Sequence, residues 1–551
     1  MACFPAIMVA ANPDWIFNDL NFMDHWFSWG YFLHMAQFKK WFPGAYYGDR
    51  LPWIFPGYII HSIFDPVLAK YVLHGGLLLA ITGAFHWLMR KAAGSQNAIL
   101  VTILFGGNAM VLTAVGADYV DGAGAMYSLA ALAFAVQASR PATRSRLWLG
   151  LAGAMTAAMV YVNLFLLLLT PIALLTHLFL IAPHRPGWDW WKARRSSLLQ
   201  FAAGALLLTF LLSFINYWLE GAFLFQQSSF SVGALLLSKR NPLAAPSPQW
   251  ITGAWWLVFP LAGLASALAL LLLPHSEPLQ EPQDQWRTRL RFALCLHTVF
   301  LWACYLILQW ANGLWLETTY YVTYLLPSAF LSLGLALNAD WKPVGLPRRW
   351  IWACLLLLIT AYSIRPRDHL LHPNYWVIPA AAFLAAIVWK LWRPSIAAIA
   401  SVWICLLAAQ FFVSMQRFRY GPPIAARHAS LRRIAEGSRL VAAVGGPDKV
   451  LFWYDESEPL GIEFRAMLSA HLFGYSMLGN AFPVLSSDRY HNLQERKMVI
   501  LTSKLPWERV VDMAYQPLHE RGFEPRFLTR MHVDDTGKGY DLVFVDLKRK
   551  P

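Results

Sequence analysis

Three groups of polar side chains in the first quarter of the sequence could carry chemistry, and the first centres on Asp24. It lies in the stretch NDLNFMDHWFSWGYF, next to Trp26 and close to Trp29. A carboxylate held beside such rings is partly removed from water, so it binds a proton more tightly and suits the role of a general base. An aspartate that caps a helix or lies in a solvated loop is the alternative.

The second group is the acidic pair Asp118 and Asp121 in GADYVDGAGAMYSLAAL. A spacing of three residues can place both carboxylates on one face, and Asp121 is well placed to cap the helix that follows. A cap needs only one aspartate, and this short loop has no basic neighbour. The pair therefore predicts a carboxylate site, with a purely structural role for both acids as the alternative.

The third group is Tyr46, Tyr47 and Arg50 in YYGDRLPWIFPG. A guanidinium can hold a phosphate by paired hydrogen bonds, which makes Arg50 a candidate ligand of a specific phosphate. Contact with lipid headgroups is the alternative. Lys239 and Arg240 could add a second cation, although solvated loop positions fit them equally well.

The other polar candidates are less specific. Glu317 shortly precedes two adjacent tyrosines and could serve a site or only solvate its loop. The spacing of the histidines does not match a metal site, so we interpret them as core or interface residues; they are His25, His34, His61, His74 and His86. The sequence thus predicts no metal ligands.

The composition shows what kind of protein must position these residues. The 551-residue chain is 57% hydrophobic and 14% charged, whereas a soluble domain is about 25% charged. Residues 1–415 contain 40 charged side chains and residues 416–551 contain 36, which predicts a membrane domain followed by a soluble one. The net charge of +14 lies mostly in loops between apolar runs, so it favours a role in membrane orientation over nucleic-acid binding.

Twelve apolar runs are long enough, or nearly so, to cross a bilayer. A thirteenth would be the stretch 1–11, which is too short to span and suggests a first helix that is truncated or begins upstream. The twelve lie at about 67–89, 96–117, 122–138, 147–163, 164–182, 197–219, 251–273, 292–310, 319–338, 351–364, 376–392 and 395–415.

The basic residues predict the orientation of these runs. With the N-terminus in the cytoplasm, the inside loops contain 17 basic residues and the outside loops contain seven, as the positive-inside rule requires. This places the C-terminal domain outside. The spanning runs themselves are almost free of charge, Lys70 being the nearest exception. Because ion-coupled transporters place charges near the midplane, we expect any chemistry at the outer interface instead.

Two other segments belong to the outer side. The segment 12–66 is rich in tryptophan and predicts one or two helices along the membrane surface, closed by an extended stretch around Pro52 and Pro56. The residue pattern of the C-terminal domain predicts a small α/β fold, which we expect to cover or shape a site. Its expected strands are 449–455, 498–504 and 540–547, and its expected helices are 460–473 and 507–521.

Taken together, these features resemble the glycosyltransferase C superfamily, above all its bacterial protein-mannosyltransferase-like and aminoarabinose-transferase-like enzymes. The resemblance rests on the first loop with Asp24, the later Arg50–Leu51–Pro52, the second loop with Asp118 and Asp121, and the outer C-terminal domain. It implies a polytopic fold of about thirteen helices that binds membrane lipids and lies in the bacterial inner membrane, with the C-terminal domain in the periplasm.

The resemblance also implies an activity, the inverting transfer of a sugar from a polyprenyl-phosphate donor to a lipid, glycan or protein acceptor. Asp24 matches the general base of such enzymes, and Arg50 lies where relatives place a cation on the donor phosphate. Asp121 is the preferred match for the second-loop acid, with Asp118 as co-candidate. Because Asp24 is followed by His25 rather than by a second acid, a requirement for a divalent metal stays open.

Two other functions remain compatible with the sequence. One is a transporter or flippase of lipid-linked glycans, and the other is a membrane scaffold without catalytic activity. Replacing Asp24 by Asn separates these from the enzyme, because only an enzyme would lose turnover.

Overall fold

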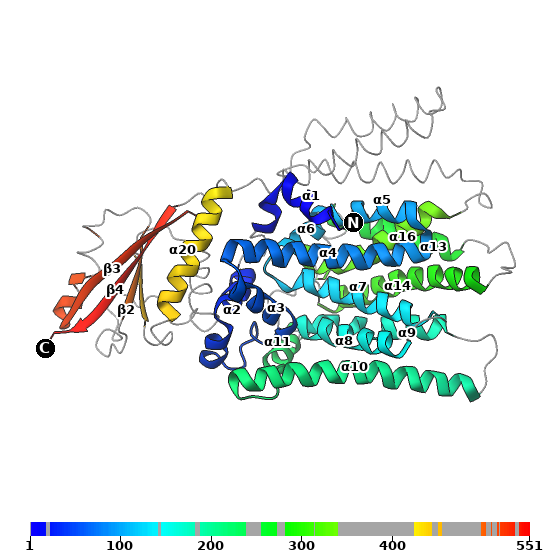
Figure 1. The fold of residues 1–551 in the computed structure, drawn as a ribbon, viewed down its shortest axis with the longest axis horizontal. Coiled ribbons are helices and arrows are strands. Elements are labelled where there is room, and N and C mark those ends of the chain that lie inside the picture. The colour runs from blue at the N-terminus through cyan, green and yellow to red at the C-terminus, as the bar shows by residue number, and fades with distance from the viewer. Residues whose placement is uncertain are drawn as a thin grey trace, which may run out of the picture.

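The structure is a computed structural model in which long helices form a bundle and a small sheet lies beyond one end of it (Figure 1). The residues that it describes are 2–17, 23–140, 145–181, 188–237, 255–272, 282–312, 315–339, 424–442, 450–454, 497–502, 509, 515–516, 518–534 and 539–550.

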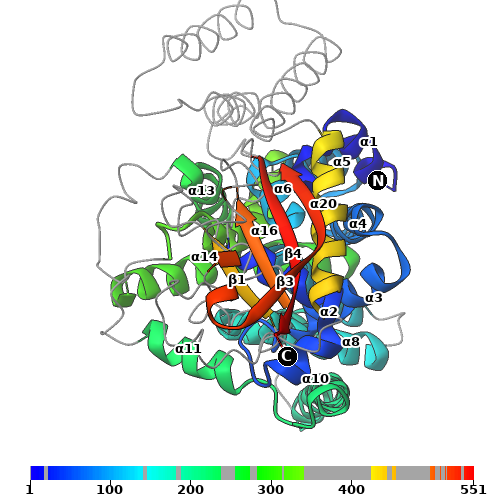
Figure 2. The same ribbon diagram turned by 90° about the vertical axis from the view of Figure 1, so that its left-hand side faces the viewer.

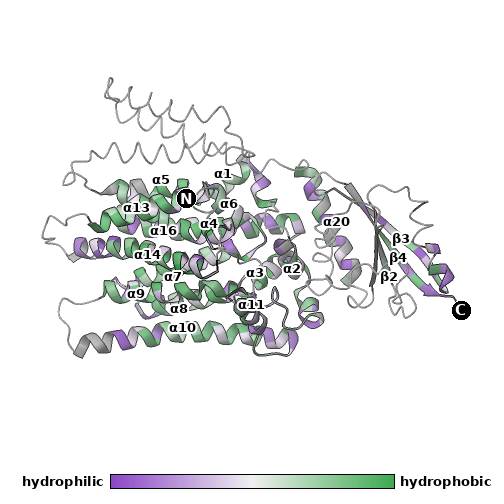
Figure 3. Ribbon diagram, turned by 180° about the vertical axis from the view of Figure 1, so that it is seen from behind, coloured by the Kyte–Doolittle hydropathy of each residue, from purple (hydrophilic) through white to green (hydrophobic). Residues whose placement is uncertain are grey.

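Within these residues, six helical segments are long and apolar enough to cross a membrane. They are α4 (Pro66–Ala93), α7 (Val120–Ala138), α8 (Ser145–Val162), α10 (Trp188–Glu220), α14 (Pro282–Asn312), and the continuous run of α15 (Thr319–Val322), η4 (Thr323–Leu325) and α16 (Leu326–Asn338). Apolar residues dominate these helices (Figure 3). The chain is a multi-pass membrane protein, as the sequence predicts.

The remaining predicted runs take other forms. The run at 96–117 is a pair of helices, α5 (Ser95–Gly106) and α6 (Ala109–Gly116), bent by 61° and counting as a seventh span if taken as one. The runs at 164–182 and 251–273 contain shorter elements, namely η2 (Leu164–Leu169), α9 (Thr170–Leu180), η3 (Trp255–Leu257) and α13 (Val258–Leu272). The last three runs, at 351–364, 376–392 and 395–415, lie outside the described residues.

Helix α10 shows how the bundle meets the membrane. Its outward face is apolar, with Leu207 71% exposed and Trp218 77% exposed, as expected of a helix that lies against lipid. Its other face packs closely on α8: a Cβ atom at Gly204 would lie only 1.8 Å from the carbonyl oxygen of Gly150. Small residues at such contacts let two membrane helices approach each other.

The segment 12–66 packs as helices on the end of the bundle. It contains η1 (Pro13–Phe17), α2 (Met23–Trp41) and α3 (Leu51–Ile63), preceded by α1 (Phe4–Ala11). Three tryptophans of this segment, Trp15, Trp29 and Trp53, are buried in the main hydrophobic core. They hold α2 and α3 against the bundle.

The expectation of an extended stretch around Pro52 and Pro56 is wrong, because both prolines lie inside α3. Pro52 occupies the first turn, where a missing N–H costs nothing. Pro56 cannot donate to the carbonyl oxygen of Pro52, and the hydroxyl of Tyr127 in α7 donates to that oxygen instead, at 2.8 Å. A tertiary contact therefore compensates for a residue that usually interrupts helices.

The C-terminal sheet has the order β1-β2-β4-β3. The strands β1 (Val450–Tyr454), β2 (Lys497–Thr502) and β4 (Gly539–Arg549) confirm the three predicted ones. The fourth, β3 (Phe523–Asp534), was not predicted, since charged residues and Pro525 interrupt its apolar pattern. Because β3 is an edge strand, it tolerates both. The predicted helix at 460–473 lies outside the described residues.

Helix α20 (Ile424–Ala442) connects the sheet to the bundle (Figure 2). On its bundle side, His428 Nε2 lies 3.2 Å from the hydroxyl of Tyr71 in α4, and Ser438 Oγ lies 2.8 Å from His34 Nε2 in α2. Arg427 donates to the carbonyl oxygen of Phe17 at 3.2 Å. The C-terminal unit is thus held at the end of the bundle where α2 and α3 lie.

The close contact between α8 and α10 predicts a position-specific effect of glycine substitution. Gly204→Ala should lower the free energy of unfolding by about 1–3 kcal/mol, because the added methyl group has no room at the contact. Gly76→Ala in α4 is the matched control, since a Cβ there meets nothing within 4 Å. Thermal unfolding in detergent measures both, and equal effects of the two variants would contradict the packing described.

Candidate functional site

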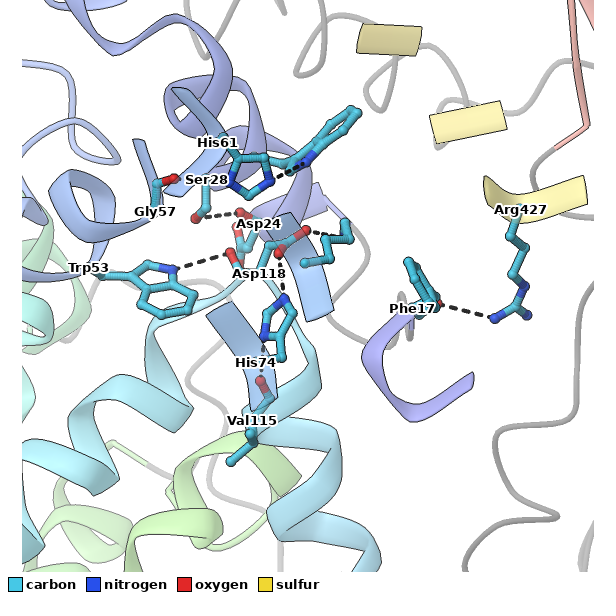
Figure 4. Close-up of polar contacts among 12 residues, drawn as sticks. Phe17, Asp24, Ser28, Trp53, Gly57, His61, His74, Val115, Asp118 and Arg427 are labelled. Atoms are coloured by element: carbon cyan, nitrogen blue, oxygen red, sulfur yellow. Dashed lines mark hydrogen bonds and ion pairs between the residues drawn. The ribbon is translucent and has the colours of Figure 1, made fainter. Parts of the chain in front are cut away.

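Asp118 lies in the connection between α6 and α7 and is fully buried. Its carboxylate forms an ion pair with Lys70 of α4, and its Oδ1 lies 2.8 Å from His74 Nε2 (Figure 4). The indole of Trp53 in α3 donates to its backbone carbonyl oxygen at 3.4 Å. Both carboxylate oxygens therefore have partners, and Asp118 connects the loop before α7 to α3 and α4.

The partners of Asp118 also determine its charge. Burial alone would raise the pKa of this carboxyl group, but the ammonium of Lys70 and the hydrogen bond of His74 outweigh burial and hold the pKa below its ordinary value. Asp118 is thus a paired carboxylate with a structural position, rather than a free base.

Asp24 lies in the first turn of α2 and is only partly buried. The hydroxyl of Tyr47, from the loop between α2 and α3, donates a hydrogen bond to its Oδ1. Burial, followed by the charge of Asp24, raises the pKa of Tyr47, so this hydroxyl stays protonated and continues to donate. The first and third groups predicted from the sequence are therefore in contact.

Arg50 is the N-cap residue of α3 and is buried among tyrosine rings. Its guanidinium carbon lies 4.1 Å from the ring centroid of Tyr46, 5.3 Å from that of Tyr47 and 5.0 Å from that of Tyr119, distances typical of cation–π contacts. Its Nη1 atom has no hydrogen-bond partner among the described residues. The guanidinium also makes a side-chain hydrogen bond with Tyr119, and its Nη1 donors are available to a further ligand.

Asp121, three residues after Asp118 in the sequence, is also fully buried. The expectation that it caps a helix is wrong, because Tyr119 is the N-cap residue and Asp121 is the second residue of α7. Its Oδ1 accepts a hydrogen bond from the hydroxyl of Tyr324 at 2.8 Å, and that hydroxyl accepts from Asn163 Nδ2 at 3.3 Å. Its Oδ2 has no partner among the described residues.

Tyr119 shows that these charges form one group. Its pKa is raised well above the ordinary value, first by burial and then by the carboxylates of Asp24 and Asp121, against the opposing charge of Arg50. Three charged side chains therefore act on a single hydroxyl. We call this group the acid–arginine cluster; its members are Asp24, Tyr46, Tyr47, Arg50, Tyr119 and Asp121. The carboxylate of Asp24 is half-buried. The guanidinium of Arg50 and the carboxylate of Asp121 each have one buried atom without a hydrogen-bond partner among the described residues.

The other predicted site residues lie elsewhere or outside the described part. Glu317 accepts a hydrogen bond from Gln309 Nε2 at 3.0 Å, and Gln309 also accepts from the backbone N–H of Leu316. Lys239 and Arg240 lie outside the described residues.

The sequence-based prediction missed two tyrosines. Tyr119 lies between the two second-loop acids in ADYVD, a position that could have indicated a role. Tyr324 gave no such signal, because 203 residues separate it from the carboxylate that it contacts.

The histidines and acids of the described part do not include a group of three or more arranged to hold a metal ion. The individual histidines have other contacts, as His61 illustrates. It accepts a hydrogen bond from the indole of Trp29 at 3.2 Å, and its Nδ1 lies 2.9 Å from the carbonyl oxygen of Gly57.

Comparison with known proteins identifies the fold. No family model and no curated protein matches the chain. The chain is similar to ArnT from Cupriavidus metallidurans bound to undecaprenyl phosphate, with a TM-score of 0.51 and 14% identity over 98% of this chain and 97% of that one. This similarity shows that the chain shares the fold of that solved structure.

Two further solved structures are more distantly similar. Apo ArnT from the same organism gives a TM-score of 0.46 at 14% identity, over 95% of this chain and 92% of that one. The archaeal oligosaccharyltransferase AglB from Archaeoglobus fulgidus, in complex with an inhibitory peptide and a dolichol-phosphate, gives a TM-score of 0.42 at 12% identity. The match covers 94% of this chain and 69% of that one.

The pairing of Asp118 predicts a charge-dependent loss of stability. Asp118→Asn should lower the free energy of unfolding by about 3–5 kcal/mol, because it leaves the buried ammonium of Lys70 without a counter-charge. The double variant Lys70→Met/Asp118→Asn removes both charges and should recover most of that loss. Thermal unfolding of the three proteins measures this, and a double variant no more stable than the single one would disprove the pairing.

The same pairing predicts a dependence on pH. Because the pKa of Asp118 is lower in the folded than in the unfolded chain, its stabilisation is present at neutral pH and is lost as the pH falls below about 4. The Lys70→Met/Asp118→Asn protein should lose less stability over that range in the same unfolding measurement.

Proposed function

We propose that the protein is an inverting glycosyltransferase that moves a sugar from a polyprenyl-phosphate donor to a lipid, glycan or protein acceptor. The observation that carries the proposal is the buried Nη1 of Arg50, which has no hydrogen-bond partner among the described residues. The charges of Arg50, Asp24 and Asp121 all act on one hydroxyl, that of Tyr119. The similarity of fold to ArnT, which was solved with undecaprenyl phosphate, supports it.

Arg50 is suited to the phosphate of the donor. A guanidinium offers several N–H donors in a plane that matches two phosphate oxygens. The rings of Tyr46, Tyr47 and Tyr119 hold it without using up a carboxylate, so its positive charge remains available. As the bond between sugar and phosphate breaks, this charge would stabilise the growing negative charge of the leaving group. Lys239 and Arg240 are proposed as additional cations.

Asp24 is suited to the acceptor. It is partly exposed, whereas Asp118 and Asp121 are fully buried, so it is the acid that an incoming acceptor can reach. It would take the proton of the attacking acceptor atom as that atom bonds to the anomeric carbon. The polyprenyl phosphate leaves from the opposite face, which inverts the configuration at that carbon. The Tyr47 hydroxyl fixes the orientation of the carboxylate.

Asp121 is suited to the reacting sugar. Its free Oδ2 is a buried negative atom that would stabilise the positive charge that develops on the sugar ring. Tyr324 holds the other oxygen. Asp118 takes no part in this scheme except to fix the loop that carries Tyr119 and Asp121.

We place this chemistry at the outer face of the bacterial inner membrane, with the C-terminal domain in the periplasm. The excess of basic residues in the loops at the other end of the spans supports this orientation. The C-terminal unit packs through α20 on the same end as the acid–arginine cluster, where it could shape the acceptor side.

The assignment of Asp24 predicts a loss of turnover without a loss of donor binding. Asp24→Asn keeps the shape of the side chain but removes the base, so kcat should fall about 10²–10⁴-fold while the affinity for undecaprenyl phosphate changes little. Asp284→Asn, an exposed acid paired with Arg287 at the start of α14, is the control and should be fully active. Glycan transfer by purified protein measures both, and full activity of Asp24→Asn would rule out the base.

A further inference from the structure

A second buried group of charges lies next to the acid–arginine cluster. Lys39, in the last turn of α2, is completely buried, and its Nζ lies 3.0 Å from Glu220 Oε2 and 3.7 Å from Asp49 Oδ1. Asp49 also accepts a hydrogen bond from Ser228. The other oxygen of Glu220 accepts from Asn216 Nδ2 at 2.8 Å. One ammonium therefore bridges two carboxylates from different parts of the chain.

Burying one ammonium and two carboxylates together costs free energy, so the arrangement calls for a physical reason. Lysine is rarely buried completely, and ion pairs removed from water gain little net stability over apolar residues of similar volume. Burial raises the pKa of Asp49 to about 6, against the opposing influence of Ser228 and Lys39. A need for stability alone does not account for three charges at this place, whereas a need to fix a geometry does.

The group directly adjoins the backbone that carries Arg50. Asp49 directly precedes Arg50, and Gln226 Nε2 donates to the carbonyl oxygen of Asp49 at 2.9 Å. On the other side, the carbonyl oxygen of Arg50 accepts from Trp53 and Ile54 in the first turn of α3. Lys39 and Ser228 hold the side chain of Asp49, while Gln226 and the first turn of α3 hold the carbonyl oxygens of Asp49 and Arg50.

The same group fixes the distance between the two proposed reacting functions. Helix α2 carries Asp24 in its first turn and, beyond a kink at His34, Lys39 in its last turn. In the loop that follows, the hydroxyl of Tyr47 donates a hydrogen bond to Asp24, and Asp49 pairs with Lys39. The segment that carries Arg50 is therefore tied twice to the helix that carries Asp24.

We propose that Lys39, held by Glu220 and Asp49, is a positioning residue that sets Arg50 in place to bind the phosphate of a polyprenyl-phosphate ligand. This inference rests on the function proposed above. Lys39 does not touch the ligand; it acts through the peptide between Asp49 and Arg50. Loss of Lys39 would leave the guanidinium free to shift away from the position that faces the acids.

The test is a double-mutant cycle on the affinity of the full-length protein for undecaprenyl phosphate in detergent. The first variant is Lys39→Met. The second variant is Lys39→Met/Glu220→Gln. It keeps the net formal charge of the group formed by Lys39, Asp49 and Glu220 unchanged, so the protein is less prone to unfold than with Lys39→Met alone. Each is also combined with Arg50→Ala, and Lys39→Arg serves as the conservative rescue. Arg287→Ala, which removes an exposed and paired arginine, is the control.

Arg50→Ala should weaken binding on the order of 100-fold, as expected for a buried charged contact with phosphate. Lys39→Met/Glu220→Gln should weaken it about tenfold, and Lys39→Arg should restore most of that loss. In the Arg50→Ala background, the loss of Lys39 should have no further effect, because its action passes through Arg50.

The outcomes separate this inference from the function on which it rests. If the native protein does not bind undecaprenyl phosphate, or if Arg50→Ala binds as tightly, the proposed function fails. If Arg50→Ala loses binding but a folded Lys39→Met/Glu220→Gln protein binds normally, only the positioning role fails. Equal losses in both backgrounds would likewise reject it, since they would indicate a general structural effect.

Discussion

The requirement that every charge buried at the end of the bundle finds a partner governs this part of the structure. Removing a carboxylate or an ammonium from water is so costly that it persists only beside an opposite charge or several hydrogen-bond donors. Lys70 meets this requirement for Asp118, and Lys39 meets it for Asp49. The first pair joins α4 to the loop before α7, and the second joins α2 to the loop before α3.

Several buried polar atoms of the described residues have no hydrogen-bond partner. Among the described residues, they include Nη1 of Arg50 and Oδ2 of Asp121, one donor and one acceptor in the same cluster. Both atoms belong to the group of charges that acts on the hydroxyl of Tyr119. In the proposed function, the guanidinium binds an anionic group and the carboxylate faces a group with positive character.

The sequence predicted the site best where its residues are close in the chain. Asp24 and Arg50 share one short segment rich in aromatic residues, and Asp118 and Asp121 share one loop, so their types and spacing were informative. The contacts made by Tyr324 depend on long-range packing that spacing cannot reveal. The misjudged prolines of α3 have the same cause, because the contact with Tyr127 that allows a helix there comes from another element.

The claim that Arg50 holds the phosphate of a lipid-linked sugar is tested most directly by mass spectrometry of the lipids that co-purify with the gently extracted protein, beside Arg50→Ala. A polyprenyl phosphate, or its glycosylated form, should be enriched on the native protein and depleted on the variant, and its mass would identify the sugar. The same lipids in the same amounts on both proteins would contradict the account.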